Sequence, residues 1–304
     1  MFKNAILYHI NCSNPLPDRA AMDDALGGVV FAPTAPTQQA SAGFVPPRGH
    51  EHAALHERIA GELILKVRTE TRAVPAAELQ RQVDAKAKVI EDQTGRKPGK
   101  KQRRELKEEV LLELLPRAFP KRADALVWIS PNKNLVVVDA SSAARASDVA
   151  ALLVQSQALG EGCSLHLLQT NLSPAAAMAA WLAAGEVDGG NFTLGREAEL
   201  KAADETKATV KYAHHGLDLD EIRGHLRQGG KLPTKLALDW RGRVGFVLTD
   251  TLAIKRIAMD DGVIGSAGEQ ADAFDADVAI FTGEMGPLLF DLEAALDLRI
   301  YPET

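Results

Sequence analysis

The chain has 304 residues, which favours about two globular domains, and its content of 46% hydrophobic and 25% charged residues is ordinary for a folded protein. No run approaches the roughly 18 apolar residues of a membrane span, and the N-terminus lacks the apolar core of a signal peptide, so we expect a cytoplasmic protein without membrane partners. The formal net charge is −6, yet residues 95–122 carry ten basic and four acidic side chains, whereas residues 260–304 carry eleven acidic and one basic.

The first third of the chain predicts strands followed by a helical hairpin. Alternating and β-branched residues indicate strands at 4–10 and 61–74, with a loop rich in Pro, Gly, Ser and Thr at 31–50 between them. After this the apolar period changes to that of a helix over about 76–92. A Gly- and Pro-containing break then separates it from a second helix at about 99–115, which gives a hairpin inserted between strands.

The rest of the chain predicts shorter strands mixed with helices. The pattern from 124 to 184 predicts strands at 124–130 and 134–140, a helix from a Ser141 or Ser142 cap to 159, a strand at 164–170, and a helix from Ser173 and Pro174 to about 184. Beyond it we expect a strand at 208–216, a helix at 220–228, a meander of 234–240, 243–250 and 252–259, and then a strand followed by a helix within 276–300.

These elements do not alternate as regular βαβ units. We therefore expect an α+β fold with mixed, largely antiparallel sheets, packed helices and a projecting helical hairpin. The expected division is a central α+β domain from 1–75 and 121–172, a helical finger at 76–120 inserted in it, and a second α+β domain at 173–304.

The chain offers few groups with the spacing of a catalytic or metal site. Cys12 and Cys163 belong to no CxxC or Cys–His pattern, so we expect two reduced cysteines and neither a disulfide framework nor a zinc site. The stretch 95–101, GRKPGKK, lacks the spacing, the following Ser or Thr and the preceding strand of a phosphate-binding loop. His214 and His215, as neighbours on a strand, point to opposite faces and are poorly placed to share one metal ion.

Carboxylates and tryptophans give equally weak signals. Asp275 and Asp277 would share one face of a strand, which is an arrangement that can bind metal or do acid–base work. Asp218 at a helix start is more simply a cap. Trp181 and Trp240 are expected in cores. We expect no catalytic residue, no metal and no cofactor.

A basic segment is the most distinctive feature of the sequence. Lys100, Arg103, Arg104 and Lys107 are spaced to form one stripe on a helix. Cations at a helix N-terminus oppose the macrodipole, at a cost of about 0.3–1 kcal/mol each when exposed, so this order suggests that they serve an anion. The alternative from the residues alone is a solvated helix face. Further cations near the helix start are Arg96, Lys97 and Lys101.

The far end of the same helix is apolar nearly all round. The run from Val110 to Leu115, followed by Pro116 and Phe119, must be buried against its own domain or against another subunit.

Seven sequence blocks spread over the whole chain resemble the family of bacterial recombination-associated RdgC proteins. None of them is a catalytic motif, and the match is specific because all seven occur in the family's order. The blocks are FKN (2–4), GFVPPRG (43–49), LLPRAF (114–119), VWI (127–129), TKLALDW (234–240), LAIKR (252–256) and FDADVAIFTGE (274–284).

The resemblance implies a DNA-binding protein that is not an enzyme. Its subunits are horseshoes with a helical finger, and two of them form a ring-shaped homodimer that encircles duplex DNA without sequence preference and antagonises the RecA recombinase. Such a protein would be cytoplasmic and associated with the nucleoid, with single-stranded DNA as a further candidate ligand. The candidate DNA-binding residues are Arg96, Lys97, Lys100, Lys101, Arg103, Arg104, Lys107, Arg117, Lys235, Arg241, Arg243, Lys255 and Arg256.

The same resemblance implies two subunit contacts. One includes Leu115 and Phe119, and the other maps near residues 213–216, where this chain has His214 and His215. Histidines at that contact would make it pH-sensitive.

Two other functions stay open on the sequence. The first is a regulator that contacts a recombinase directly through the acidic C-terminal third, with DNA binding incidental. The second is a metal-dependent nuclease using Asp275 or Asp277.

Overall fold

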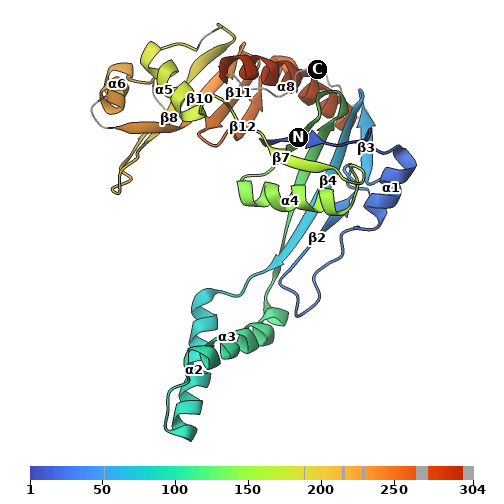
Figure 1. Cartoon of the computed structure of the whole chain (residues 1–304), viewed down its shortest axis with the longest axis vertical. Coiled ribbons are helices and arrows are strands. Elements are labelled where there is room, and N and C mark those ends of the chain that lie inside the picture. The colour runs from blue at the N-terminus through green and yellow to red at the C-terminus, as the bar shows by residue number, and fades with distance from the viewer. Residues whose placement is uncertain (51, 188, 214–215, 228–229, 265–272, 297–304) are drawn as a thin grey trace.

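The computed structural model describes residues 1–50, 52–187, 189–213, 216–227, 230–264 and 273–296. It shows an antiparallel sheet flanked by helices, with a helical hairpin projecting from one end (Figure 1). The elements of the first half are β1 (Asn4–Asn11), α1 (Arg19–Gly27), β2 (Ala40–Val45), β3 (His56–Ile59), β4 (Glu62–Arg72), α2 (Ala76–Thr94), α3 (Lys100–Leu114), the 3-10 helix η1 (Leu115–Arg117), β5 (Pro120–Ser130), η2 (Pro131–Lys133), β6 (Leu135–Val138), α4 (Ala143–Gln155) and β7 (Ser164–Leu167). Those of the second half are α5 (Pro174–Ala184), β8 (Phe192–Ala202), β9 (Thr209–Tyr212), α6 (Leu219–Arg227), β10 (Lys231–Trp240), β11 (Val244–Thr249), β12 (Ile254–Met259), α7 (Asp261–Ile264) and α8 (Ala273–Leu296).

Strand β1 joins the two halves of the sheet. The order is β2-β4-β5-β6-β1-β12-β11-β10-β8-β9, with β3 added to β4 and β7 to β1. One end of β1 pairs with β12 at Ala5↔Ile254, and the strand then pairs with β6 from Ile6↔Val138 onward. The ladders between the described strands are antiparallel, which confirms the expected α+β class.

Helices cover the sheet by burying alternate residues of its strands. In β10, Leu236, Leu238 and Trp240 lie in one apolar core together with residues of α5 and α8. Because side chains alternate along a strand, Lys235 and Ala237 lie on the opposite face. Helices α1 and α4 cover a second core built on β1, β4, β5 and β6.

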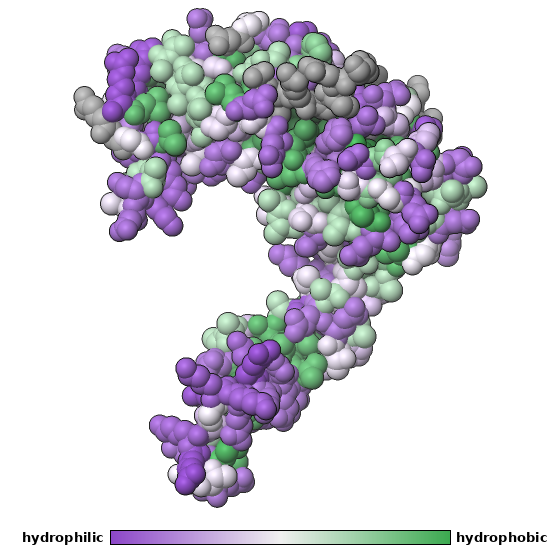
Figure 2. All heavy atoms as spheres, viewed as in Figure 1, coloured by the Kyte–Doolittle hydropathy of each residue, from purple (hydrophilic) through white to green (hydrophobic). Residues whose placement is uncertain are grey.

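The hairpin of α2 and α3, called the finger below, has an apolar core of its own. Leu79 and Val83 of α2 pack with Leu106, Val110 and Leu114 of α3. The turn begins at Gly95, whose φ of 71° is a left-handed value that favours glycine. The finger and the end of the sheet formed by β8 and β9 extend toward the same side of the molecule, and the outline between them is concave (Figures 1 and 2).

Several expected elements are confirmed by the structure. The strands at 4–10 and 61–74 and both helices of the hairpin are present. The Oγ of Ser173 caps α5 by accepting a hydrogen bond from Ala176 N, and Pro174 occupies the first turn. The tryptophans expected in cores are both buried.

The prediction for the C-terminal region was wrong in its first part, because residues 276–284 belong to helix α8 rather than to a strand. The short run around Val278 has strand-like residues, but its apolar positions continue with helical spacing through Phe281, Met285 and Leu292, all buried against the sheet. A helix also removes the expected shared strand face of Asp275 and Asp277.

The expectation of two reduced cysteines was also wrong. Cys12 and Cys163 form a disulfide across 151 residues of sequence. The antiparallel pair Asn11↔Ser164 of β1 and β7 brings the next two positions opposite each other. Local sequence does not reveal this pairing.

Other differences are smaller. The expected loop at 31–50 contains β2, which pairs along β4 from Ala40↔Thr71 to Val45↔Lys66. Elements α1, β3 and β8 are not among the expected elements. Among the described residues, no helix is both long and apolar enough to cross a membrane.

Candidate nucleic-acid interface

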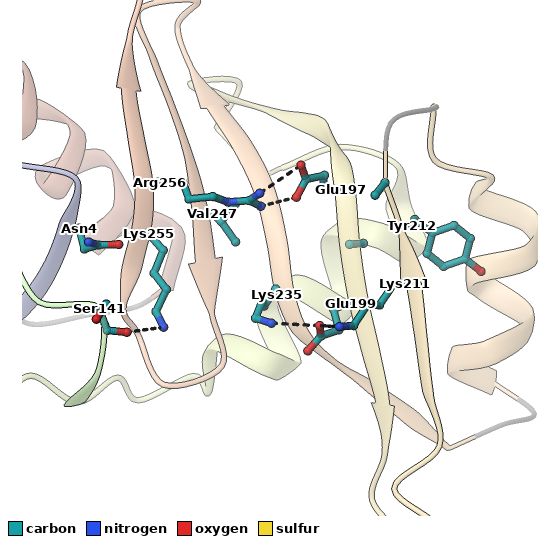
Figure 3. Close-up of a pocket in the computed structure, with 12 residues that line it drawn as sticks. Asn4, Ser141, Glu197, Glu199, Lys211, Tyr212, Lys235, Val247, Lys255 and Arg256 are labelled. Carbon is teal, nitrogen blue, oxygen red and sulfur yellow. Dashed lines mark hydrogen bonds and ion pairs between the residues drawn. The ribbon is translucent and has the colours of Figure 1, made fainter. Parts of the chain in front are cut away.

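The face of β8–β12 opposite α5 and α8, called the open face below, holds a pocket of about 470 Å³ lined with cations (Figure 3). Figure 1 shows α8 above these strands and the concave outline below them. The charged residues lining the pocket are Lys211, Lys235, Lys255, Arg256, Glu197 and Glu199.

Glu199 holds two of these cations side by side. Its carboxylate accepts hydrogen bonds from Lys235 Nζ at 3.0 Å and from Thr234 Oγ1 at 2.9 Å, and Lys211 Nζ lies at 3.2 Å. Burial raises the pKa of Glu199, but the hydrogen bonds from Lys235, Thr234 and Lys211 outweigh it and lower the pKa to about 2. The carboxylate is therefore ionised at physiological pH and fixes both ammonium groups in position.

A local irregularity in β12 brings two consecutive cations to the same pocket. Neighbours on a strand normally point to opposite faces. Arg256 has a φ of 52°, and the β11–β12 register shifts between Gly245 and Val247. Bulges of this kind re-aim side chains, so Lys255 and Arg256 both line the pocket.

These two cations have different partners. Lys255 Nζ donates to the Ser141 carbonyl at 3.0 Å, and Arg256 pairs with Glu197. Figure 3 shows the Lys235–Glu199 and Arg256–Glu197 pairs side by side across β8, β10 and β12. The pocket thus contains four cations and two carboxylates, which leaves it positive.

The predicted stripe of α3 is exposed, and its members differ in their partners. Arg103 pairs with Asp84 of α2, and Arg104 Nε pairs with Glu108 at 3.1 Å. Lys100 and Lys107 form no ion pair within the part of the chain that the structure describes. Among the described residues, the other exposed cations without an ion pair at this end of the finger are Lys88, Arg96, Lys97 and Lys101.

Arg241 and Arg243 lie on the side of the sheet that α8 covers. Arg241 Nη2 pairs with Asp291 at 2.9 Å, and Arg243 pairs with Glu284. Residues Arg241 and Gly242, both at positive φ, form the tight turn between β10 and β11 that aims these arginines at α8. Asp275 likewise pairs with Arg48 at 2.5 Å.

The residues expected at subunit contacts differ in their exposure to solvent. Phe119 is 93% exposed, and Leu112 on the last turns of α3 is also exposed. Leu115 is fully buried within its own protomer, and Arg117 beside it is exposed. His214 and His215 lie outside the described residues.

One basic residue of the open face was missed at the sequence level. Lys211 lies on β9 and reaches the pocket because Glu199 of β8 is its direct partner in the antiparallel ladder. The alternation in the sequence TVKY indicates a strand, but it does not indicate which strand is next to it. In the described ranges, no three His, Cys, Asp or Glu side chains group closely enough to hold a metal ion.

Comparison with known proteins gives matches along the whole chain. A family model described as "Putative exonuclease, RdgC" matches residues 1–299. The chain is 38% identical over 300 residues to the recombination-associated protein RdgC of Cupriavidus pinatubonensis, with 97% of each chain covered. It is 39% identical over 305 residues to the protein of the same description from Dechloromonas aromatica and 35% identical over 299 residues to that from Bordetella pertussis, again with 97% of each chain covered. The chain therefore belongs to the RdgC family.

Proposed function

We propose that this protein binds duplex DNA without sequence preference and modulates recombination by limiting the access of RecA to DNA. The observation that carries the proposal is the open face, where four cations and two carboxylates line a pocket on the concave side of the molecule. The finger, which carries further exposed cations, borders the other end of the same concavity (Figure 2). A duplex lying between the open face and the finger would meet positive charge on both sides.

The chemistry of the open face suits phosphate rather than bases. Lysine and arginine neutralise phosphates and release condensed counterions, which gives affinity that falls steeply with salt and carries no sequence information. The aromatic residue of the pocket, Tyr212, is buried, so it offers no exposed ring for bases to stack on. This favours duplex over single-stranded DNA.

We propose further that two protomers close into a ring around the duplex, with each subunit shaped as a horseshoe. The support is Phe119, a large apolar side chain that is almost wholly exposed at the root of the finger. Aromatic side chains are enriched in protein–protein interfaces relative to the rest of the surface. Phe119→Ala is expected to weaken the dimer, measured by sedimentation equilibrium, and a dimer of unchanged affinity would contradict this assignment.

The DNA-binding proposal is tested by fluorescence anisotropy with several duplexes of unrelated sequence and a matched single strand. We expect dissociation constants within a few-fold of one another for the duplexes, a steep linear dependence of log K on log salt, and weaker binding of the single strand. Strong preference for one sequence, or binding indifferent to salt, would overturn the proposal.

A non-catalytic role is part of the proposal. Both carboxylates of the pocket are already paired with cations, an arrangement that orders basic side chains for an anion. Incubation of end-labelled linear duplex with the protein and Mg²⁺ or Mn²⁺ should leave the DNA intact. Release of nucleotides by the purified protein, lost in a Glu197→Gln/Glu199→Gln variant, would replace this proposal with a nuclease.

The second candidate function is direct contact with a recombinase through the acidic surface of α8. Phe290 on this helix is 62% exposed, which is the observation that favours it. The two functions differ in a strand-exchange assay with RecA. Inhibition that disappears when competing duplex titrates the protein away supports DNA occupation, whereas inhibition that persists and is lost in Phe290→Ala supports direct contact.

A further inference from the structure

A network of buried and half-buried polar groups lies beneath the exposed Phe119. At its centre is Glu70 of β4, which is only 1% exposed although it is a carboxylate. Its Oε1 accepts hydrogen bonds from Thr34 N at 2.8 Å and Thr34 Oγ1 at 2.5 Å, and its Oε2 accepts from Arg122 Nε at 2.7 Å. These contacts connect the loop before β2 to the finger end of the β4–β5 ladder.

The network continues from Thr34 to the backbone next to Phe119. Arg72 Nε donates to Thr34 Oγ1 at 2.9 Å, and Arg72 Nη1 donates to the carbonyl oxygen of Ala118 at 3.0 Å. The planar guanidinium makes both bonds at once with fixed geometry. A direct chain of hydrogen bonds therefore runs from the buried Glu70 to the peptide that precedes Phe119.

The backbone around Phe119 is fixed on both sides. Ala118 N donates to the Leu115 carbonyl at 3.0 Å, and Leu115 is fully buried. On the other side, Pro120 is the direct partner of Arg72 in the β4–β5 ladder. The ring itself nevertheless projects into solvent. Holding the backbone of a binding segment in place before association lowers the entropic cost of binding.

We propose that Arg72, held by Thr34 and Glu70, is a positioning residue that presents Phe119 to a second copy of this chain. This inference rests on the proposed self-association through Phe119 and identifies the groups that prepare that surface. The occupant is a second copy of this chain, because the self-association proposed above takes place through Phe119.

A double-mutant cycle between Arg72 and Phe119 tests the inference. The variants are Arg72→Met, Phe119→Ala and the combination, with the dimer dissociation constant measured by sedimentation equilibrium. We expect Arg72→Met to weaken the dimer about tenfold on its own but less than twofold in the Phe119→Ala background. Arg58→Met, which removes an exposed guanidinium from β3 outside this network, is the matched control and should leave the dimer unchanged.

A second variant separates positioning from folding. Thr34→Val removes the hydroxyl that links Glu70 to Arg72 while keeping the side-chain volume, and it should weaken the dimer by a smaller factor that also vanishes without Phe119. The melting temperature is recorded for every variant, so that only folded proteins are compared.

The possible failures of the two proposals are distinguishable. A dimer weakened by Phe119→Ala but not by Arg72→Met, or weakened equally by Arg72→Met in both backgrounds, overturns the positioning role alone. A dimer unaffected by Phe119→Ala overturns the self-association proposal and this inference with it.

Discussion

The contribution of the finger to DNA binding is measurable as a change in salt dependence. We consider Lys100→Gln/Lys107→Gln, which removes two exposed cations from one face of α3 that form no ion pair within the described residues. Each cation that neutralises a phosphate contributes about 0.9 to the slope of log K against log salt. The double variant should therefore reduce the slope by about 1.8 for each finger that engages the duplex.

The same reasoning gives the expected loss of affinity. We take the wild type and the variant to bind equally at 1 M salt. A slope difference of about 1.8 then makes the dissociation constant of the variant roughly 30-fold higher at 0.15 M salt. Paired cations are expected to contribute less, because their charge is already partly neutralised. Arg104, which pairs with Glu108, is the internal comparison.

The assay is fluorescence anisotropy of one labelled duplex at several salt concentrations. Arg19→Gln/Arg58→Gln is the matched control, since it changes the net charge equally at α1 and β3, on the side of the molecule away from the concavity. Equal slopes for wild type and the Lys100/Lys107 variant would refute a phosphate contact by the finger. Equal reductions in the variant and the control would show a general effect of net charge instead.

Three further predictions concern single contacts. Lys100→Glu places an acid in the first turn of α3, where none now lies, so it should stabilise the finger by about 0.3–1 kcal/mol while weakening DNA binding; faster hydrogen exchange of α3 amides would contradict this. Hydrogen bonds from Thr34 and Arg122 lower the pKa of Glu70 to about 2, so its ionised form stabilises the fold fully above about pH 4.5 and progressively less toward pH 2. The difference in melting temperature between wild type and Glu70→Gln should therefore shrink from pH 5 to pH 3, unlike any difference for the exposed control Glu161→Gln, and a constant difference would count against the network. Finally, the Cys12–Cys163 bond predicts no free thiol in the unreduced, denatured protein and a loss of about 2–4 kcal/mol on Cys12→Ser; titration of two thiols would disprove it.

Local patterns were sufficient where the structure depends on neighbours in sequence. The Ser173–Pro174 start of α5 and the hairpin of α2 and α3 follow from caps, breakers and apolar period. The basic stripe is on the exposed face of α3, as its spacing predicts, because Leu106 and Val110 occupy the buried face.

The positions of the other basic residues depend on pairings between strands that are distant in sequence. Lys211 joins the open face only through the β8–β9 ladder, and Lys255 and Arg256 share the pocket only through a register shift. Arg241 and Arg243, which sequence alone groups with them, pair with acids of α8. A charge pattern shows how many cations a segment carries, but the sheet register determines which face each one reaches.

The most direct test of the central claim is lysine footprinting with and without duplex DNA. An amine-reactive label read out by mass spectrometry compares residues of the open face and finger with Lys133, which contacts α8 at Gly286 on the opposite side. The account predicts that duplex DNA of any sequence protects Lys235, Lys255 and Lys100 and leaves Lys133 reactive. Protection of Lys133 with unchanged labelling of Lys235 and Lys255 would contradict it.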